Sequence, residues 1–277
     1  MMGVGPFSIQ AVIIFAAILL AWLAARVAAR GLPDGAHKRA GAMVLDAVMW
    51  GLVAARLGYI AQWWEEYSAA PRAMIAIGDG GFSWRVGLLA ALAYVGWRSR
   101  PAPLLRGPVL TGLVVGGMAW VAAQGVLEHL RQSAAPLPDL QLMALDGRPL
   151  ALQTYAGRPI VLNLWASWCP PCRREMPVFE QAQEEFPHIA FVMINQGESA
   201  AQARRFLTSE GLVLRDVLLD PASSAMRELR SSGLPTTLFF DADGALVHSH
   251  MGELTMASLK STILRRFAPA APASAAP

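Results

Sequence analysis

An uncharged run of nineteen residues near the start of the chain, Phe7 to Ala25, constrains the fold most strongly. A helix of this length crosses a hydrocarbon core of about 30 Å. No basic segment precedes the run, and it is longer than the apolar part of a secretory signal. We therefore expect a membrane-spanning helix and not a cleaved signal peptide. Only 16% of all residues are charged, whereas soluble domains carry about a quarter.

Three further apolar segments follow, at about residues 42–63, 83–97 and 108–127. The last of them carries no charge, and the first contains Asp46 and Arg56. The middle segment is short and has Arg85 near its start. Residues 1–128 are thus predicted to form an α-helical membrane domain with about four transmembrane helices.

Basic residues concentrate in two of the loops between these segments, which hold Arg26, Arg30, Lys38 and Arg39 in the first and Arg98, Arg100 and Arg106 in the third. The second loop instead holds Glu65, Glu66 and Asp79, with Arg72 as its basic residue. Basic loops stay in the cytoplasm. We therefore expect a multi-pass protein of the bacterial inner membrane, with everything after Leu127 facing the periplasm.

The composition changes after about residue 136 to mixed segments of ordinary charge content. We expect a linker at 129–138, an α/β domain at 139–267 and a disordered Ala/Pro-rich tail at 268–277.

A net charge of +3 argues against a nucleic-acid partner. The chain has no GxGxxG, GxxxxGK[ST] or HExxH motif, so no cofactor is expected.

Ionisable residues within membrane helices mark either a functional site or a structural contact. For Asp46 and Arg56 the structural alternatives are a helix-packing ion pair or snorkelling toward the helix ends. Gly112 and Gly116 form a GxxxG pattern. This pattern permits close helix contact, and it also arises by chance in glycine-rich membrane helices.

Both cysteines of the chain lie in one Cys169-Pro-Pro-Cys172 motif, between an apolar strand at 160–164 and a helix at 173–186. A zinc site would need more ligands, and the nearest histidine is His188. A structural disulfide that closes so short a ring would restrain little chain. The pattern therefore favours redox chemistry over both alternatives.

The position of the motif assigns the two cysteines different roles. Attack on a disulfide requires a thiolate, and a helix N-terminus lowers the pKa of a thiol. Cys169 precedes the helix, and Pro170 and Pro171 occupy its first turn, where a missing N–H costs little. Cys169 is thus the predicted nucleophile, and Cys172, one turn further on, resolves the mixed disulfide.

The remaining pattern is that of an α/β domain, with strands expected at 190–195, 236–240 and 246–250, a hairpin turn at 241–244, and helices at 200–210, 223–229 and 255–267. Arg173 and Arg174 add positive charge beside the motif, or simply face solvent. His188, His248 and His250 have no motif context and are expected at the surface or on an edge strand.

Residues 135–267 resemble the TlpA/ResA/DsbE group of membrane-tethered thioredoxin-like thiol-disulfide oxidoreductases. The matching residues are Pro138-Asp139, Asp146-Gly147, Trp165–Pro177 and Gly233–Thr237. The resemblance implies a central sheet flanked by helices and a cis bond before Pro235. It also implies that the substrate docks at Trp168, Pro170, Pro171, Leu234 and Pro235.

An acidic residue often stands beside the active site in this group, at the position of Glu175. There it handles the proton of the resolving cysteine. The alternative is a surface carboxylate that stabilises the N-terminus of the helix.

The resemblance favours the reduction of protein disulfides outside the cytoplasm, for example at haem-binding cysteines in cytochrome c biogenesis or at copper sites. It implies a DsbD-like membrane electron donor, because the membrane half has no cysteine to relay electrons. The alternatives are an extracytoplasmic thiol oxidase, a lipid transferase and a non-catalytic membrane adaptor.

The membrane half is similar to the front part of prolipoprotein diacylglyceryl transferases, through Asp46, Ala55–Tyr59, Gly80–Trp84 and Gly87–Leu89. Those enzymes carry a histidine where this chain has Arg85, and an arginine near Gly117 that is missing here. Three of their seven helices are also missing. We therefore expect an inactive, transferase-like membrane module that serves as a scaffold or binds a partner.

Overall fold

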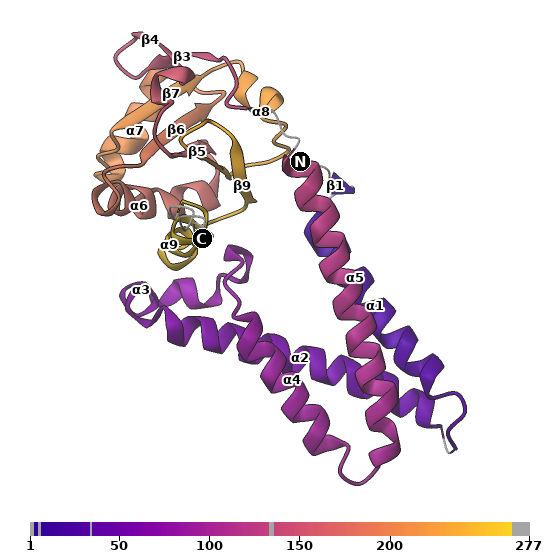
Figure 1. Ribbon diagram of the computed structural model, residues 1–277. Helices are drawn as coiled ribbons and strands as arrows, with labels where there is room; N and C mark the ends of the chain where they lie inside the picture. Colours follow the sequence, from indigo (N-terminus) through magenta and orange to yellow (C-terminus); the bar gives the residue numbers. More distant parts are fainter. Residues whose placement is uncertain (1–2, 5–6, 34, 133–135, 268–277) are drawn as a thin grey trace, which may run out of the picture. The chain divides into compact units, whose positions relative to one another are not determined.

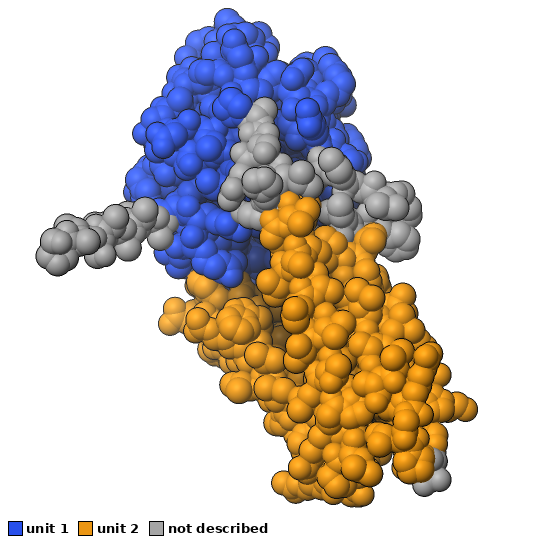
Figure 2. Space-filling view, turned by 45° about the vertical axis from the view of Figure 1, so that its right-hand side comes forward, with its two compact units in different colours: residues 1, 69–80, 131–277 blue, residues 2–68, 81–130 orange. Residues whose placement is uncertain are grey.

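The computed structural model describes residues 3–267 except 5–6, 34 and 133–135. It divides into two compact units, shown in different colours in Figure 2. Unit 1 holds Ala69–Gly80 and Arg131–Pro277 together with residue 1, and unit 2 holds Met2–Ser68 and Gly81–Leu130. The expected tail at 268–277 lies outside the described residues.

Unit 2 is mainly helical (Figure 1). Its region of the chain contains β1 (Gly3–Val4), β2 (Phe7–Ser8), α1 (Ile9–Ala28), α2 (Ala36–Gln62), α3 (Trp64–Ala69), α4 (Trp84–Arg98), the 3-10 helix η3 (Pro103–Leu105) and α5 (Arg106–Gln132). The α5 helix continues through Gln132, so residues 129–132 of the expected linker are helical.

Three stretches are long and apolar enough to cross a membrane, at Ala11–Ala28, Ala36–Gln62 and Pro103–Leu127. The third predicted segment does form a helix, α4, but this helix has only 15 residues. At 1.5 Å per residue it is about 22 Å long, less than the hydrocarbon core of about 30 Å. The described structure therefore offers three candidate spans where the sequence suggested about four.

Close backbone contact joins α1 to α5 at the GxxxG glycines. A Cβ added at Gly112 would lie 2.5 Å from the carbonyl oxygen of Ala21, and one added at Gly116 would lie 2.8 Å from that of Ala17. Side chains at these two positions would therefore force the helices apart. The GxxxG pattern thus marks a real helix contact.

The α4 helix runs antiparallel along α2. Gly87 lies against the carbonyl of Gly51, and the Tyr94 hydroxyl donates to Asp46 Oδ2 at 3.0 Å. Arg56 donates to the Gly81 carbonyl at 2.9 Å. These hydrogen bonds favour the structural interpretation of Asp46 and Arg56.

Unit 1 contains a seven-stranded mixed sheet of order β4-β3-β7-β6-β5-β8-β9 (Figure 1). The strands are β3 (Gln141–Ala144), β4 (Pro149–Ala151), β5 (Ile160–Trp165), β6 (Ala190–Gln196), β7 (Asp216–Asp220), β8 (Thr236–Phe240) and β9 (Leu246–Met251). The helices are η4 (Leu152–Tyr155), α6 (Pro170–Glu185), α7 (Ala200–Glu210), α8 (Ser224–Glu228) and α9 (Met256–Arg266). The short helices η1 (Pro71–Ile75) and η2 (Ile77–Asp79) also belong to this unit.

Apolar cores cover both faces of the sheet. Residues of α6, α7 and α9 form the core on one face, and residues of η4 and α8 form the core on the other. Every residue of β5 and β6 is therefore buried, as expected for central strands with covered faces. Their parallel pairing places Trp165 opposite Asn195, so the loops that follow the two strands leave the sheet side by side.

Most predicted elements of the α/β domain are present. Strand β7 was not predicted, because Val217–Leu219 is too short an apolar run to distinguish a strand from a loop by periodicity. Residues 69–80 were expected only as a loop between membrane helices. Within unit 1, Asp79 is buried and accepts a hydrogen bond from the Thr255 hydroxyl at 3.0 Å.

Candidate active site

The Cys169–Cys172 pair lies where β5 leads into α6, and its two sulfur atoms form a disulfide. Cys169 is the N-cap residue, and its Sγ accepts a hydrogen bond from the Cys172 N–H at 3.3 Å. Pro170 and Pro171 occupy the first turn of α6. The predicted placement of the motif is therefore confirmed, and the first N–H group of the helix, that of Cys172, points at the Cys169 sulfur.

Accessibility differs sharply within the motif. Cys172 is fully buried, Cys169 is 4% exposed, and the neighbouring Trp168 is 68% exposed. Of the two cysteines, Cys169 is therefore the one that a partner can reach, and the exposed Trp168 precedes it directly in the chain. The roles predicted for these residues require this order of exposure.

The loop before β8 adjoins the cysteines. The Leu234–Pro235 bond is cis, as the resemblance implied. Leu234 packs against the core that contains both cysteines, and Thr236 pairs with Leu164 on β5. The predicted docking residues from the two loops are thus neighbours in the fold, although their contact with a substrate remains a prediction.

Glu175 is fully buried on the side of α6 that faces the sheet. Its Oε1 accepts a hydrogen bond from Asn163 Nδ2 at 2.8 Å, and its Oε2 accepts one from the Leu254 N–H at 3.0 Å. Burial raises the pKa of this carboxyl to about 8, although both hydrogen bonds oppose the shift. The alternative of a surface carboxylate is therefore wrong.

The amide of Asn163 provides a place for the proton that Glu175 holds. Asn163 Nδ2 also donates to Thr237 Oγ1 at 3.1 Å. Its Oδ1 is buried and has no hydrogen-bond partner among the described residues. Rotation of the amide would present Oδ1 to Glu175, and a protonated carboxyl would donate to it.

A second buried carboxylate, Glu198, contacts the loop that leads into the motif. It lies between β6 and α7 and is 4% exposed. It accepts three hydrogen bonds, from the Ser167 N–H at 2.7 Å, the Ser167 hydroxyl at 2.5 Å and Asn195 Nδ2 at 2.6 Å. Glu198 was not predicted as a site residue, and its position just after a central strand is the one sequence signal that pointed to it.

Two arginines follow the motif on α6, and both form ion pairs. Arg173 contacts Glu210 at 2.6 Å, and Arg174 contacts Glu253 at 2.6 Å.

His248 and His250 lie on β9, the edge strand, as predicted. Burial lowers the pKa of His250.

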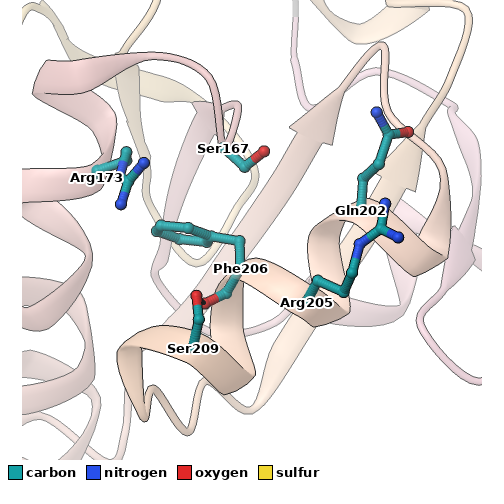
Figure 3. A pocket seen from close by; sticks show the side chains of 6 residues that line it. All are labelled: Ser167, Arg173, Gln202, Arg205, Phe206 and Ser209. Atoms are coloured by element: carbon teal, nitrogen blue, oxygen red, sulfur yellow. Dashed lines mark hydrogen bonds between the residues drawn. The ribbon is translucent and has the colours of Figure 1, made fainter.

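A shallow groove of about 330 Å³ adjoins the motif (Figure 3). It is lined by Ser167, Arg173, Gln202, Arg205, Phe206 and Ser209. Arg173 lies over the Phe206 ring, 5.3 Å from its centre. Arg205 is exposed and forms no ion pair with a described residue, so it adds a positive charge to the lining of the groove.

Known families match the two halves of the chain separately. The Redoxin family matches residues 132–263, and the prolipoprotein diacylglyceryl transferase family matches residues 1–121. The two resemblances drawn from sequence motifs are confirmed at this level. No transferase activity follows from the second match.

Individual relatives cover the C-terminal half. The thioredoxin-like protein YneN of Bacillus subtilis is 31% identical over 136 residues, which are 48% of this chain and 79% of YneN. The thiol-disulfide oxidoreductase ResA of Geobacillus thermodenitrificans is 29% identical over 44% of this chain and 71% of its own length. A thioredoxin-family thiol:disulfide interchange protein from Chlorobium tepidum has 23% identity and a TM-score of 0.43, with 48% of this chain and 96% of that structure covered. Through its C-terminal half, the chain belongs to the thioredoxin-like proteins, and thiol-disulfide oxidoreductases of the ResA type are among its homologues.

Proposed function

We propose that the chain is a membrane-anchored enzyme that reduces disulfides of extracytoplasmic proteins with the Cys169–Cys172 dithiol. The observation that carries the proposal is the cysteine pair, bonded at the first turn of α6 beside the exposed Trp168. The relatives named thiol-disulfide oxidoreductase support the same chemistry.

The reaction proceeds through a mixed disulfide. The Cys169 thiolate attacks one sulfur of the substrate disulfide, and the other substrate sulfur leaves and takes up a proton. Cys172, as a thiolate, then attacks Cys169 Sγ. This step releases the second substrate thiol and forms the Cys169–Cys172 disulfide. In total, two electrons and two protons pass from the cysteine pair to the substrate.

Glu175 is suited to exchange a proton with Cys172. It follows Cys172 by three residues on α6, so the two side chains lie on the same side of the helix. Its pKa of about 8 is close to that of an ordinary thiol, about 8.5. A proton passes between groups of similar pKa at little cost in free energy.

The groove beside the motif suits the substrate segment that flanks the disulfide. Ser167 and Arg173 bring the groove next to the two cysteines, and Arg205 supplies a free positive charge. We expect substrates with an acidic residue near the disulfide to bind there, because complementary charges steer the encounter of two proteins.

The packing of unit 2 supports the proposed orientation. One buried cluster includes Ala29, just after α1, and Ala36, the first residue of α2, together with Leu105 at the end of η3 and Val109 in the first turn of α5. The loops after α1 and after α4 therefore lie on the same side. Both loops are basic, which favours the cytoplasm and leaves the thioredoxin-like domain outside.

The reducing direction requires that electrons reach the cysteine pair. Both cysteines of the chain lie in the motif, so the membrane half offers no thiol relay. A separate DsbD-like membrane dithiol donor is therefore part of the proposal. The transferase-like half then serves as an anchor and a partner-binding module.

The redox state of the motif in intact cells tests the direction. Cells are quenched with acid, and the thiols are alkylated with a reagent that adds mass. Mostly reduced Cys169 and Cys172 would support disulfide reduction. A mostly oxidised pair would replace the proposal with a thiol oxidase that awaits electrons.

Trapping tests the exchange itself. Cys172→Ser cannot complete the second attack, so Cys169 should remain bonded to natural partners in the membrane fraction. Cys169→Ser is the matched control and should trap no partner. If Cys172→Ser captures no protein, the exchange mechanism is wrong.

A further inference from the structure

Glu198 and the cysteine motif meet at the carboxyl ends of two parallel strands. Trp165, the last residue of β5, lies opposite Asn195 on β6. Two residues after Trp165 comes Ser167, and two residues after the end of β6 comes Glu198. The fold therefore brings a carboxylate against the residue two positions before Cys169.

Three hydrogen bonds fix this carboxylate on the motif loop. Ser167 donates both its N–H and its hydroxyl to Glu198, and Asn195 donates to the same oxygen as the Ser167 N–H. An ionised carboxylate has only acceptor sites, and hydrogen bonds to it are about twice as strong as bonds between neutral groups. A buried acceptor of this kind ties the loop to the central strand β6.

We propose that Glu198 is a positioning residue of the cysteine pair, which holds the loop before Cys169 in place and whose negative charge favours the disulfide over the dithiol. The proposal rests on the proposed function, because it concerns the same exchange reaction.

The sign of the charge effect follows from electrostatics. The reduced pair carries a thiolate, and a neighbouring negative charge disfavours that thiolate. The disulfide is neutral and is not disfavoured. Glu198 thus makes the pair a better electron donor, in agreement with a reducing role.

The two carboxylates of the site differ in their surroundings. Glu175 accepts two hydrogen bonds and has a raised pKa because it is buried. Glu198 accepts three, two of them from the motif loop itself. Glu175 is thus suited to hold a proton, whereas Glu198 ties the motif loop to β6.

Glu198→Gln separates the charge from the hydrogen bonds. The glutamine oxygen accepts from the Ser167 N–H and from Asn195, and its amide donates to the Ser167 hydroxyl, which can also accept. The test measures the equilibrium of the full chain, in detergent, with reduced and oxidised glutathione. Glu198→Gln should shift this equilibrium toward the dithiol at least threefold. A tenfold shift would correspond to about 30 mV.

The matched control is Glu184→Gln. Glu184 is an exposed residue of the same helix as Cys172 and lies twelve residues further on, about 18 Å along the helix. Its charge is screened at this distance. Glu184→Gln should leave the equilibrium within twofold of the wild type, and an equal shift in both variants would overturn the charge effect.

Ser167→Ala tests the positioning role and remains informative if Glu198→Gln fails to fold. It keeps the charge and the Ser167 N–H bond but loses the hydroxyl bond. We expect a severalfold slower exchange with a peptide disulfide and an equilibrium within twofold of the wild type. An unchanged rate would overturn the positioning role. A wild-type pair that does not exchange at all would overturn the proposed function as well.

Discussion

The side chain of Glu175 links the chemistry of the site to the stability of the sheet domain. Its pKa is about 8 in the folded state, because it is buried between α6 and β5, and near 4.5 when exposed. Between these two pH values the folded state keeps a proton that the unfolded state has lost. Unfolding therefore releases a proton, and rising pH favours it.

Glu175→Gln should remove this pH dependence. In the wild type, the contribution of the Glu175 carboxyl to the free energy of unfolding is fully present below about pH 4.5 and is lost above about pH 8. The variant should therefore be more stable than the wild type at pH 8, by up to a few kcal/mol, since one pKa unit equals about 1.4 kcal/mol. Hydrogen exchange of β5 amides in the full chain measures the change. Equal pH slopes in both proteins would contradict the raised pKa.

The same residue should also shape the rate of exchange. If Glu175 exchanges a proton with Cys172, the rate at which Cys172 attacks the mixed disulfide should change near pH 8, the pKa of the Glu175 carboxyl. In Glu175→Gln this inflection should disappear, while the formation of mixed disulfides at Cys169 continues. Stopped-flow measurement of both steps across pH 6–9 separates them. An inflection that persists in the variant would exclude this role of Glu175.

At the scale of elements, α7 supplies much of the proposed docking groove. Arg205→Glu should lower kcat/KM by about tenfold for a peptide disulfide flanked by aspartate and raise it for one flanked by lysine, because the rim charge reverses. Arg215→Glu makes the same charge change at an exposed residue outside the groove. If both variants respond alike, the effect is one of net charge and the groove is not the docking site.

The close packing of α1 against α5 depends on the absence of side chains at the two GxxxG positions, Gly112 and Gly116. Gly112→Val would place a Cβ 2.5 Å from the Ala21 carbonyl oxygen, and overpacking of this kind costs about 1–3 kcal/mol. We expect thermal unfolding of the full chain in detergent at a temperature lower by several degrees. Gly117→Val is the matched control, because a Cβ at Gly117 meets no described atom within 4 Å. Equal losses in both variants would mean that valine itself, and not the helix contact, is responsible.

Local patterns predicted the elements better than the contacts between them. The CPPC motif predicted the start of α6 because proline and a helix N-terminus are local signals. Glu198 gave no such signal, because its partner Ser167 is 31 residues away and comes near only through the parallel pairing of β5 and β6. The burial of Glu175 likewise depends on Leu254, 79 residues further along the chain.

At the scale of the whole molecule, the number of membrane crossings decides where the cysteines act. By length, α4 is too short to cross alone, yet it runs antiparallel to α2. The cluster that joins Ala29 and Ala36 to Leu105 also places both basic loops on one side. This packing requires that the chain return to the side of the first basic loop before α5 begins.

Labelling of single cysteines by a membrane-impermeant maleimide on intact spheroplasts tests this topology. In a Cys169→Ser, Cys172→Ser background, Gly31→Cys and Pro101→Cys probe the two basic loops, and Val213→Cys probes the sheet domain; all three positions are exposed. We expect labelling of the third variant alone, and labelling of all three after permeabilisation. If Pro101→Cys reacts on intact spheroplasts and Gly31→Cys does not, α4 fails to return the chain, and the thioredoxin-like domain cannot face outward by the proposed route.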